Sequence, residues 1–204
     1  MVEEASNSTD GKAGSTINPP VIFLGDIWKW LENVCDPEVP VLSVLDLGVV
    51  RSIVIHNNDL EIISPVDTKA NSEQSILKGP QSKIIIYITP TYTGCPAMSM
   101  IAANIRVELL ANGLDNVRVV EILSPAWTTD WMSESGKQKL LEYGIAPPQN
   151  KARMEKMLFS DIAVPCPLCG SENTERISEF GSTACKSLHR CLDCREPFDY
   201  FKCH

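Results

Sequence analysis

Four cysteines near the C-terminus have the spacing of a metal site. Cys166-Pro-Leu-Cys169 and Cys191-Leu-Asp-Cys194 are two Cys-x2-Cys pairs, and 21 residues separate Cys169 from Cys191. Two close pairs of thiolates can complete a tetrahedron around one zinc ion when a short strand pair spans the gap. Because four protein ligands leave no open position for substrate, the expected zinc is structural rather than catalytic. The sequence therefore predicts an all-β zinc ribbon over residues 161–204.

A second cysteine of chemical interest lies upstream, at Cys95. The segment Thr89-Pro-Thr-Tyr-Thr-Gly-Cys-Pro96 leaves an apolar run and enters a helical pattern. A thiol beside a helix N-terminus lies among unpaired backbone N–H groups at the positive end of the dipole, which favours the thiolate. Gly94 permits an unusual backbone conformation, and Pro96 suits a first helical turn. We therefore expect Cys95 to be a reactive thiol.

Two acidic residues are candidates to accompany this thiol. Asp36 and Glu38 lie in Cys35-Asp-Pro-Glu-Val-Pro40, and their carboxylates could be partners of a bound metal or of the Thr93 hydroxyl. The alternative is that Asp36 forms an Asx-type turn ahead of the proline, which is common chemistry for Asp at that position. The sequence leaves both interpretations open, and only proximity to Cys95 would decide between them.

Hydrophobic periodicity predicts the elements that position these residues. In chain order the pattern indicates a helix with Ile27, Trp30, Leu31 and Val34 on its core face, strands at Val49–Ile55, Leu60–Ile63 and Lys83–Thr89, a helix from Met98 that ends near Gly113, and a strand at Val117–Leu123. The apolar run in Lys83–Thr89 suits a central strand. This order predicts an α/β (α+β) fold, a small mixed-sheet sandwich with helices on one face.

The chain divides into four predicted segments. Residues 1–18 are a disordered polar tail, 19–125 the α/β domain, 126–160 a connector with a helix at Ser133–Tyr143, and 161–204 the ribbon. Residues 64–82 lack apolar periodicity, so we expect an exposed loop there. In the connector, Trp127 and Trp131 either pack the helix onto the first domain or form a docking surface for a partner.

Composition narrows the cellular setting. The 204 residues carry a formal net charge of −8, which argues against nucleic acid as a partner of the ribbon. The N-terminus lacks the apolar core of a signal peptide, so the eight cysteines are expected to stay reduced in the cytoplasm. No apolar stretch reaches the ~18 residues of a membrane span. A soluble cytoplasmic protein with protein partners fits best.

Two sets of motifs carry a family resemblance. Asp36-Pro-Glu-Val-Pro-Val-Leu-Ser-Val-Leu-Asp-Leu-Gly48, followed by Thr93-Gly-Cys-Pro96, resembles the metal-sulfur cluster assembly factors. Three further stretches resemble the PaaD family, the D subunits of bacterial phenylacetyl-CoA epoxidase systems: Pro125–Met132, Glu142–Pro148, and Phe180–Lys186 with Arg195–Cys203. The resemblance runs from about Ile27 to the C-terminus, apart from the 64–82 loop.

The resemblance implies a non-enzymatic accessory factor of aerobic phenylacetate degradation that assists iron-sulfur cluster assembly or maturation. Cys95 matches the family's candidate cluster-handling cysteine. The implied mechanism is transient ligation of a cluster or of iron by Cys95, in a pocket shaped by Asp36, Glu38 and Thr93. Because one thiolate cannot hold a cluster alone, a cysteine of a partner or of a second protomer is expected to complete the site. The implied partners are the reductase or oxygenase components and a second copy of the chain.

Two functions from other classes remain open. A non-catalytic adaptor would merely dock oxygenase and reductase, and it would tolerate Cys95→Ser. A thiol-dependent redox enzyme would use Cys95 as its nucleophile, but it needs a base, and only spatial proximity of His56 would supply one. The roles of Cys185, Cys203 and His204 are also open. Cys185 fits a hairpin position better than a ligand position, with a labile second site made from Cys185 and Cys203 as the alternative.

Overall fold

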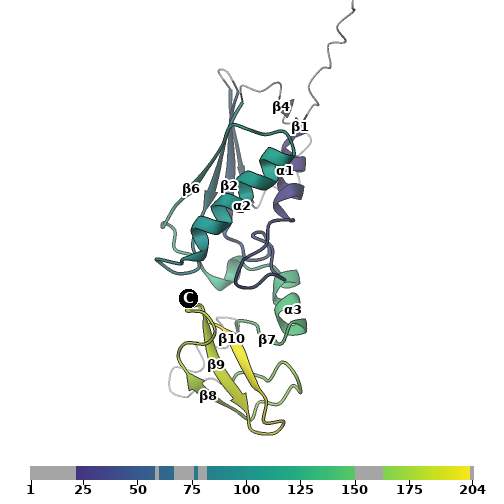
Figure 1. Ribbon diagram of the computed structural model, residues 1–204, viewed down its shortest axis with the longest axis vertical. Helices are drawn as coiled ribbons and strands as arrows, with labels where there is room; N and C mark the ends of the chain where they lie inside the picture. The colour runs from purple at the N-terminus through teal and green to yellow at the C-terminus, as the bar shows by residue number, and fades with distance from the viewer. Residues whose placement is uncertain (1–21, 58–59, 67–75, 78–81, 150–162, 203–204) are drawn as a thin grey trace, which may run out of the picture.

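The computed structural model describes residues 22–57, 60–66, 76–77, 82–149 and 163–202 (Figure 1). These residues form two four-stranded mixed sheets, one two-stranded sheet and three α-helices. The predicted tail, Cys203 and His204 lie outside the described residues. No helix in these ranges is both long and apolar enough to cross a membrane.

The first sheet has the strand order β3-β2-β5-β6. Its strands are β2 (Val50–Asn57), β3 (Leu60–Pro65), β5 (Lys83–Ile88) and β6 (Val117–Glu121). β2 runs antiparallel to both neighbours, whereas β5 and β6 are parallel because a helix connects them. The predicted hairpin and the central position of the apolar strand are therefore confirmed.

Helices α1 (Leu24–Leu31) and α2 (Ala97–Ala111) cover one face of this sheet (Figure 1). The alternate residues Ile84, Ile86 and Ile88 of β5 are buried against them, as the two-residue period of a strand requires. On α1 the residue buried beside Ile27 and Leu31 is Trp28, and the predicted Trp30 is only partly buried.

A hydrogen-bond network around the buried Asp46 carboxylate fixes α3 (Glu134–Glu142) to the first domain. Asp46 Oδ2 accepts hydrogen bonds from the Ser43 hydroxyl at 3.0 Å and from Lys139 Nζ at 2.6 Å. Its Oδ1 accepts from the Ser133 hydroxyl at 2.8 Å, and Ser133 in turn caps α3 by accepting the Gly136 N–H. Asp46 is 7% exposed, so the carboxylate is buried but fully paired.

The two connector tryptophans pack inward, as one of the two sequence interpretations expects. Trp127 is 3% exposed and donates its indole N–H to the Leu47 carbonyl at 2.9 Å. The Arg51 guanidinium lies 3.4 Å from the centroid of the Trp131 ring. Trp131 is the last residue of the short 3-10 helix η2 (Thr129–Trp131), which precedes α3.

The ribbon sheet has the order β7-β10-β9-β8. Its antiparallel core is β8 (Thr174–Ser178), β9 (Lys186–Cys191) and β10 (Pro197–Phe201), and β7 (Ile145–Ala146) adds a parallel edge strand. β7 falls in the predicted connector. The boundaries at 125 and 160 remain predictions, but the connector contributes backbone pairing to the ribbon.

The ribbon and the first domain share buried contacts. Cys185 and Phe201 belong to the same buried cluster as Trp127 and the core of the α/β domain. The ring centroids of Trp127 and Phe201 are 6.2 Å apart. The end of the ribbon sheet is therefore packed on the first domain rather than tethered beside it.

The prediction of an exposed loop over 64–82 holds at Pro65 but is wrong at Ser64 and Ser82, and part of the segment forms a strand. β4 (Ile76–Leu77) pairs antiparallel with β1 (Ile22–Phe23), and Ser64 and Ser82 are buried. Ser64 accepts a hydrogen bond from the Trp28 indole at 3.2 Å. A two-residue strand leaves too short a pattern to be recognised from sequence. Residues 67–75 and 78–81 lie outside the described ranges.

Candidate functional site

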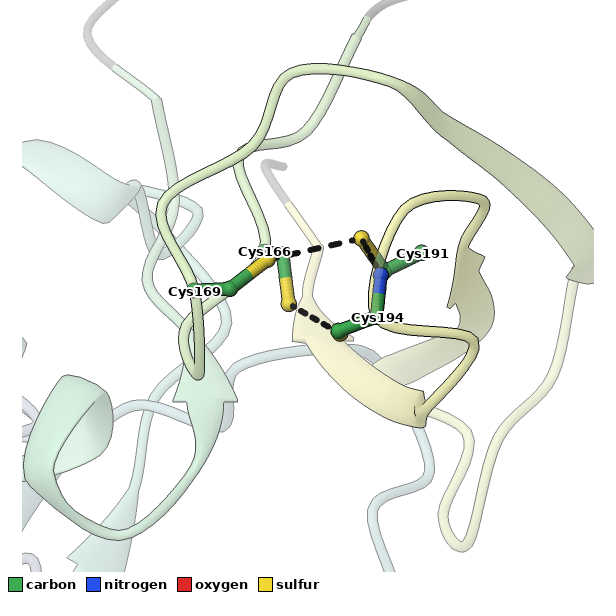
Figure 2. Close-up of side chains that lie close together, drawn as sticks. All are labelled: Cys166, Cys169, Cys191 and Cys194. Atoms are coloured by element: carbon green, nitrogen blue, oxygen red, sulfur yellow. Dashed lines mark hydrogen bonds between the residues drawn. The ribbon is translucent and has the colours of Figure 1, made fainter.

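The four knuckle cysteines converge on one point (Figure 2). Their sulfur atoms all lie within 4.8 Å of one another, with Cys166 and Cys194 at 3.7 Å and Cys169 and Cys191 at 3.6 Å. Sulfurs bound tetrahedrally at about 2.3 Å from one ion would be separated by about 3.8 Å. The group thus fits a single tetrahedral metal ion.

Both knuckles use the same backbone geometry. The N–H of the first cysteine of each pair donates to the carbonyl five residues later, Cys166 to Ser171 at 2.8 Å and Cys191 to Glu196 at 3.0 Å. The fourth residue after each first cysteine has a positive φ, 75° at Gly170 and 66° at Arg195. This turn directs both thiols of a pair to the same side.

The electrostatics of the knuckles favour a cation. The Cys194 N–H donates to the Cys191 sulfur at 3.5 Å and lowers the pKa of Cys191 to about 7. The pKa of Cys194 is raised to about 12. A hydrogen bond from the Glu196 N–H lowers this pKa, but burial and the three neighbouring thiols together raise it by more. Without a cation the four thiols cannot all ionise, so metal binding must release protons.

Cys95 lies at the junction of β5 and α2, as the sequence predicts. The Cys95 N–H donates to the Tyr92 carbonyl at 3.2 Å. Gly94, which has φ 85°, precedes Cys95, and Pro96 follows it. The helix α2 then begins at Ala97. The Tyr92 side chain is hydrogen-bonded to the Cys95 thiol. Cys95 is half-buried rather than fully exposed.

The helix N-terminus favours the Cys95 thiolate through the Ala97 N–H, as expected, but burial of the sulfur outweighs this effect. Burial raises the pKa of the Cys95 thiol above its usual value, and the negative charges of Glu38 and Asp36 add to this effect. Hydrogen bonds from the Ala97 N–H and from Tyr92 lower the pKa but do not compensate. The sequence could not reveal how much solvent the fold removes from this sulfur.

The structure brings the two predicted acidic residues to Cys95 but gives Asp36 a structural role as well. Asp36 Oδ1 accepts the backbone N–H groups of Glu38 at 2.7 Å and Val39 at 2.8 Å, which is the Asx-type turn of the alternative interpretation. Its charge nevertheless acts on the Cys95 thiol together with that of Glu38. Thr93 is exposed, and within the described part of the chain no hydrogen bond joins its hydroxyl to these carboxylates.

Sequence reasoning missed two members of this neighbourhood, Tyr92 and Cys185. The pKa of Tyr92 is raised to about 12 by burial, then by the adjacent Cys95 thiol and by the charges of Glu38 and Cys185. Cys185 is 5% exposed, and its sulfur lies 3.0 Å from the Thr183 hydroxyl. Tyr92 could have been chosen from its place in the Cys95 loop. The position of Cys185 depends on how the ribbon docks, which no local motif encodes.

Cys95 also lines an open hollow on the first domain. The hollow has a volume of about 440 Å³ and is formed by residues of β5, the Cys95 loop, α2 and β6: Ile88, Gly94, Cys95, Pro96, Met98, Ser99, Ala102, Val119 and Glu121. The Cys95 thiol is therefore accessible from this hollow.

The described histidines do not supply a base to Cys95. His56 is paired with Lys83, the first residue of β5, whereas the Cys95 loop follows the last residue of that strand. His189 is buried in the ribbon, stacks on Phe198 at 5.6 Å and is hydrogen-bonded to Ser187. The geometry that would support a Cys-His thiol enzyme is therefore missing from the described residues.

Comparison with known proteins gives a close match over nearly the whole chain. The family model of the PaaD zinc beta ribbon domain matches residues 150–202. A curated protein of Escherichia coli (strain K12), described as the putative D subunit of 1,2-phenylacetyl-CoA epoxidase, is 42% identical over 189 residues, which are 93% of this chain and 97% of that protein.

Two solved structures are similar to part of the chain. A DUF59 domain of unknown function from Bacillus anthracis is 22% identical, with a TM-score of 0.43, over 57% of this chain and 90% of that one. A Mycobacterium tuberculosis protein described as associated with [Fe-S] complex assembly and repair is 23% identical, with a TM-score of 0.32, over 67% and 98% of the two chains.

Proposed function

The chain belongs to the PaaD family of phenylacetyl-CoA epoxidase D subunits, and from this premise we propose that it is an accessory subunit that assists iron-sulfur cluster assembly or maturation in that system. It does not itself catalyse epoxidation in this proposal. The pathway is aerobic phenylacetate degradation in the cytoplasm of a bacterium.

The observation that carries the proposal is the surroundings of Cys95. A half-buried thiol with a hydrogen-bonded tyrosine and two carboxylates in electrostatic range opens on a surface hollow. Soft thiolates bind iron and clusters, and carboxylates can accept a proton from a thiol or bind iron directly. Solvent access from the hollow suits a cargo that must enter and leave.

The two cysteine sites have separate tasks in this proposal. The four-cysteine group holds zinc, because its sulfur separations fit one ion and zinc is redox-inert. A cluster with several irons places its thiolates on different metal atoms, which requires wider separations. The transient cargo is therefore assigned to Cys95, and the ribbon metal stabilises the fold.

Cargo binding requires that Cys95 lose its proton. The raised pKa keeps the thiol protonated in the resting state, which protects it from adventitious oxidation because the thiolate is the reactive form. An incoming metal supplies the positive charge that offsets Glu38 and Asp36. The Tyr92 hydroxyl supports the sulfur in the ionised form by donating a hydrogen bond.

The proposed partners are protein components of the epoxidase system. A cluster bound through Cys95 must pass to a client, either the reductase or the oxygenase, and a second copy of the chain is the other candidate donor of ligands. The acidic net charge of −8 is consistent with protein rather than nucleic-acid partners.

Cys95→Ser tests the proposal directly. After anaerobic purification we expect about one zinc per chain in wild type and variant, with iron and sulfide in the wild type only. In cells the variant should no longer support epoxidase activity. Cys35→Ser is the matched control, since Cys35 lies next to Asp36 but its sulfur contacts only the Asn33 carbonyl at 3.9 Å among the described hydrogen bonds. Full support of epoxidase activity by Cys95→Ser would refute the proposal.

An adaptor role remains the second candidate because one helix face is apolar and exposed. Met100, Val107 and Leu110 of α2 are 54%, 66% and 59% exposed and lie on one side of the helix. An adaptor would tolerate Cys95→Ser but would lose partner binding on Val107→Glu. Co-purification of the epoxidase components with each variant distinguishes the two functions.

A further inference from the structure

Two cysteines from different parts of the chain belong to one packed region. Cys95 precedes α2 in the first domain, and Cys185 precedes β9 in the ribbon. Cys185 is a member of the buried cluster of the first domain, and Tyr92 and Cys95 pack against that same cluster. The two residues are separated by 90 positions in sequence, so only the docking of the ribbon brings them into one neighbourhood.

The docking that places Cys185 is specific rather than incidental. The Lys202 N–H donates to the Cys185 carbonyl at 2.9 Å, and the Lys186 N–H donates to the Thr183 carbonyl at 3.1 Å, which fixes the turn before β9. These hydrogen bonds fix Cys185 within the ribbon. The ribbon in turn packs on the first domain, where the ring centroids of Phe201 and Trp127 are 6.2 Å apart in the same buried cluster as Cys185.

The same charged groups surround both thiols. Glu38 and Asp36 lie within electrostatic range of Cys95 and of Cys185, and Tyr92 lies within range of both sulfurs. Lys186 is the cation that acts on Cys185. Two thiols, two carboxylates and a phenol therefore form one electrostatic neighbourhood where the ribbon packs on the first domain.

We propose that Cys185 is the second thiolate ligand of the Cys95 site, so that a single chain holds its cargo between the α/β domain and the ribbon. This inference rests on the proposed cluster-handling function, and it replaces the need for a cysteine from a partner or a second protomer. Asp36 and Glu38 are the further oxygen ligands that this neighbourhood offers.

The chemistry of the side chains points to the class of cargo. Thiolates are the usual protein ligands of iron-sulfur clusters, and carboxylates can bind iron beside them.

Loading with ferrous iron and sulfide under anaerobic conditions tests the inference on the zinc-containing full chain. We expect wild type and Cys35→Ser to take up iron and sulfide with visible charge-transfer absorption. Cys95→Ser and Cys185→Ser should each lose at least about four-fifths of this uptake, because a cluster with one remaining thiolate dissociates. The zinc content of each variant shows whether its ribbon is folded. If Cys185→Ser loses zinc, Cys185→Ala is tested in its place.

The outcomes separate this inference from the proposed function. Normal uptake by Cys185→Ser or Cys185→Ala, with loss in Cys95→Ser, would overturn the Cys185 assignment and leave the function standing. No uptake by the wild type would overturn both.

A mixing experiment distinguishes ligands within one chain from ligands shared between two. Equal amounts of Cys95→Ser and Cys185→Ser, combined before loading, should take up no more cluster than either variant alone. Restored uptake in the mixture would mean that the two thiolates come from different copies, and it would refute the single-chain site.

Discussion

At the scale of single residues, the reactivity of Cys95 reflects opposing local effects. Burial and the charges of Glu38 and Asp36 raise its pKa, whereas the Ala97 N–H and the Tyr92 hydroxyl lower it. The thiol is therefore protonated at neutral pH, and thiolate ligation becomes easier as the pH rises toward the folded-state pKa.

This balance predicts opposite effects for two substitutions. Glu38→Gln removes a negative charge and should lower the pKa of Cys95, so that alkylation at a fixed pH below the pKa becomes faster. Tyr92→Phe removes a hydrogen bond that supports the thiolate and should slow the reaction. Mass spectrometry of the Cys95 peptide over a range of pH measures both rates. If both substitutions changed the alkylation rate in the same direction, the opposite effects assigned to Glu38 and Tyr92 on the pKa of Cys95 would be wrong.

A second residue-scale prediction concerns the backbone of the first knuckle. Gly170 has φ 75°, and a Cβ added there would meet nothing within 4 Å, so Gly170→Ala adds conformational strain without a clash. We expect a loss of about 1 kcal/mol in unfolding free energy of the zinc-loaded protein. Arg195→Gly, at the equivalent position of the second knuckle, relieves the same strain and should cause no loss. Chemical denaturation at saturating zinc measures both, and equal destabilisation would refute the strain argument.

At the scale of elements, α3 is held by one carboxylate. The Asp46 carboxylate accepts hydrogen bonds from the side chains of Lys139, Ser133 and Ser43. The position of α3 in turn determines where β7 joins the ribbon sheet. Burial alone would raise the pKa of Asp46, but these hydrogen bonds outweigh it and lower the pKa below its usual value. The stabilisation is present above the unfolded-state pKa of about 3.9 and is lost as pH falls through the lower folded-state pKa.

Asp46→Asn should therefore destabilise the protein by about 2 kcal/mol at pH 7, because it leaves the hydrogen-bond donors without a charged acceptor. The matched control is Glu134→Gln on the same helix, whose ion pair with Lys137 is exposed and should contribute less than about 0.5 kcal/mol. Thermal denaturation at pH 7 compares them. The difference between wild type and Asp46→Asn should shrink as the pH falls below 4, and a constant difference would contradict the charge-based account.

At the scale of the whole molecule, the ribbon is coupled to the first domain through its own core residues. Phe201 is 1% exposed and packs on Trp127, while Cys185 joins the same buried cluster. In Figure 1 the connector and α3 lie between the two sheets. Loss of the ribbon fold would therefore expose part of the first domain as well.

Zinc removal should reveal this coupling. Chelation is expected to unfold the ribbon, since a structural zinc site contributes to folding directly, and to shift Trp127 emission to longer wavelength as Phe201 departs. The helical circular dichroism of α1 and α2 should persist. Trp127→Phe is the control that removes the fluorescence change. Unchanged emission after measured zinc release would contradict the coupling.

The sequence determined the local architecture well. The two Cys-x2-Cys pairs, the order of helices and strands and the central apolar strand all depend on residue spacing, which reflects the period of each element. The position of Cys95 at the start of α2 followed from the Gly-Cys-Pro motif for the same reason.

Only the tertiary structure decided what surrounds Cys95. Its raised pKa depends on burial, and burial depends on segments far away in sequence. The short β1-β4 pairing, the Asp46–Lys139 contact and the arrival of Cys185 beside the first domain are likewise long-range contacts. Such contacts form when segments that are distant in the sequence pack together, and the residues of one segment do not specify which other segment it will contact.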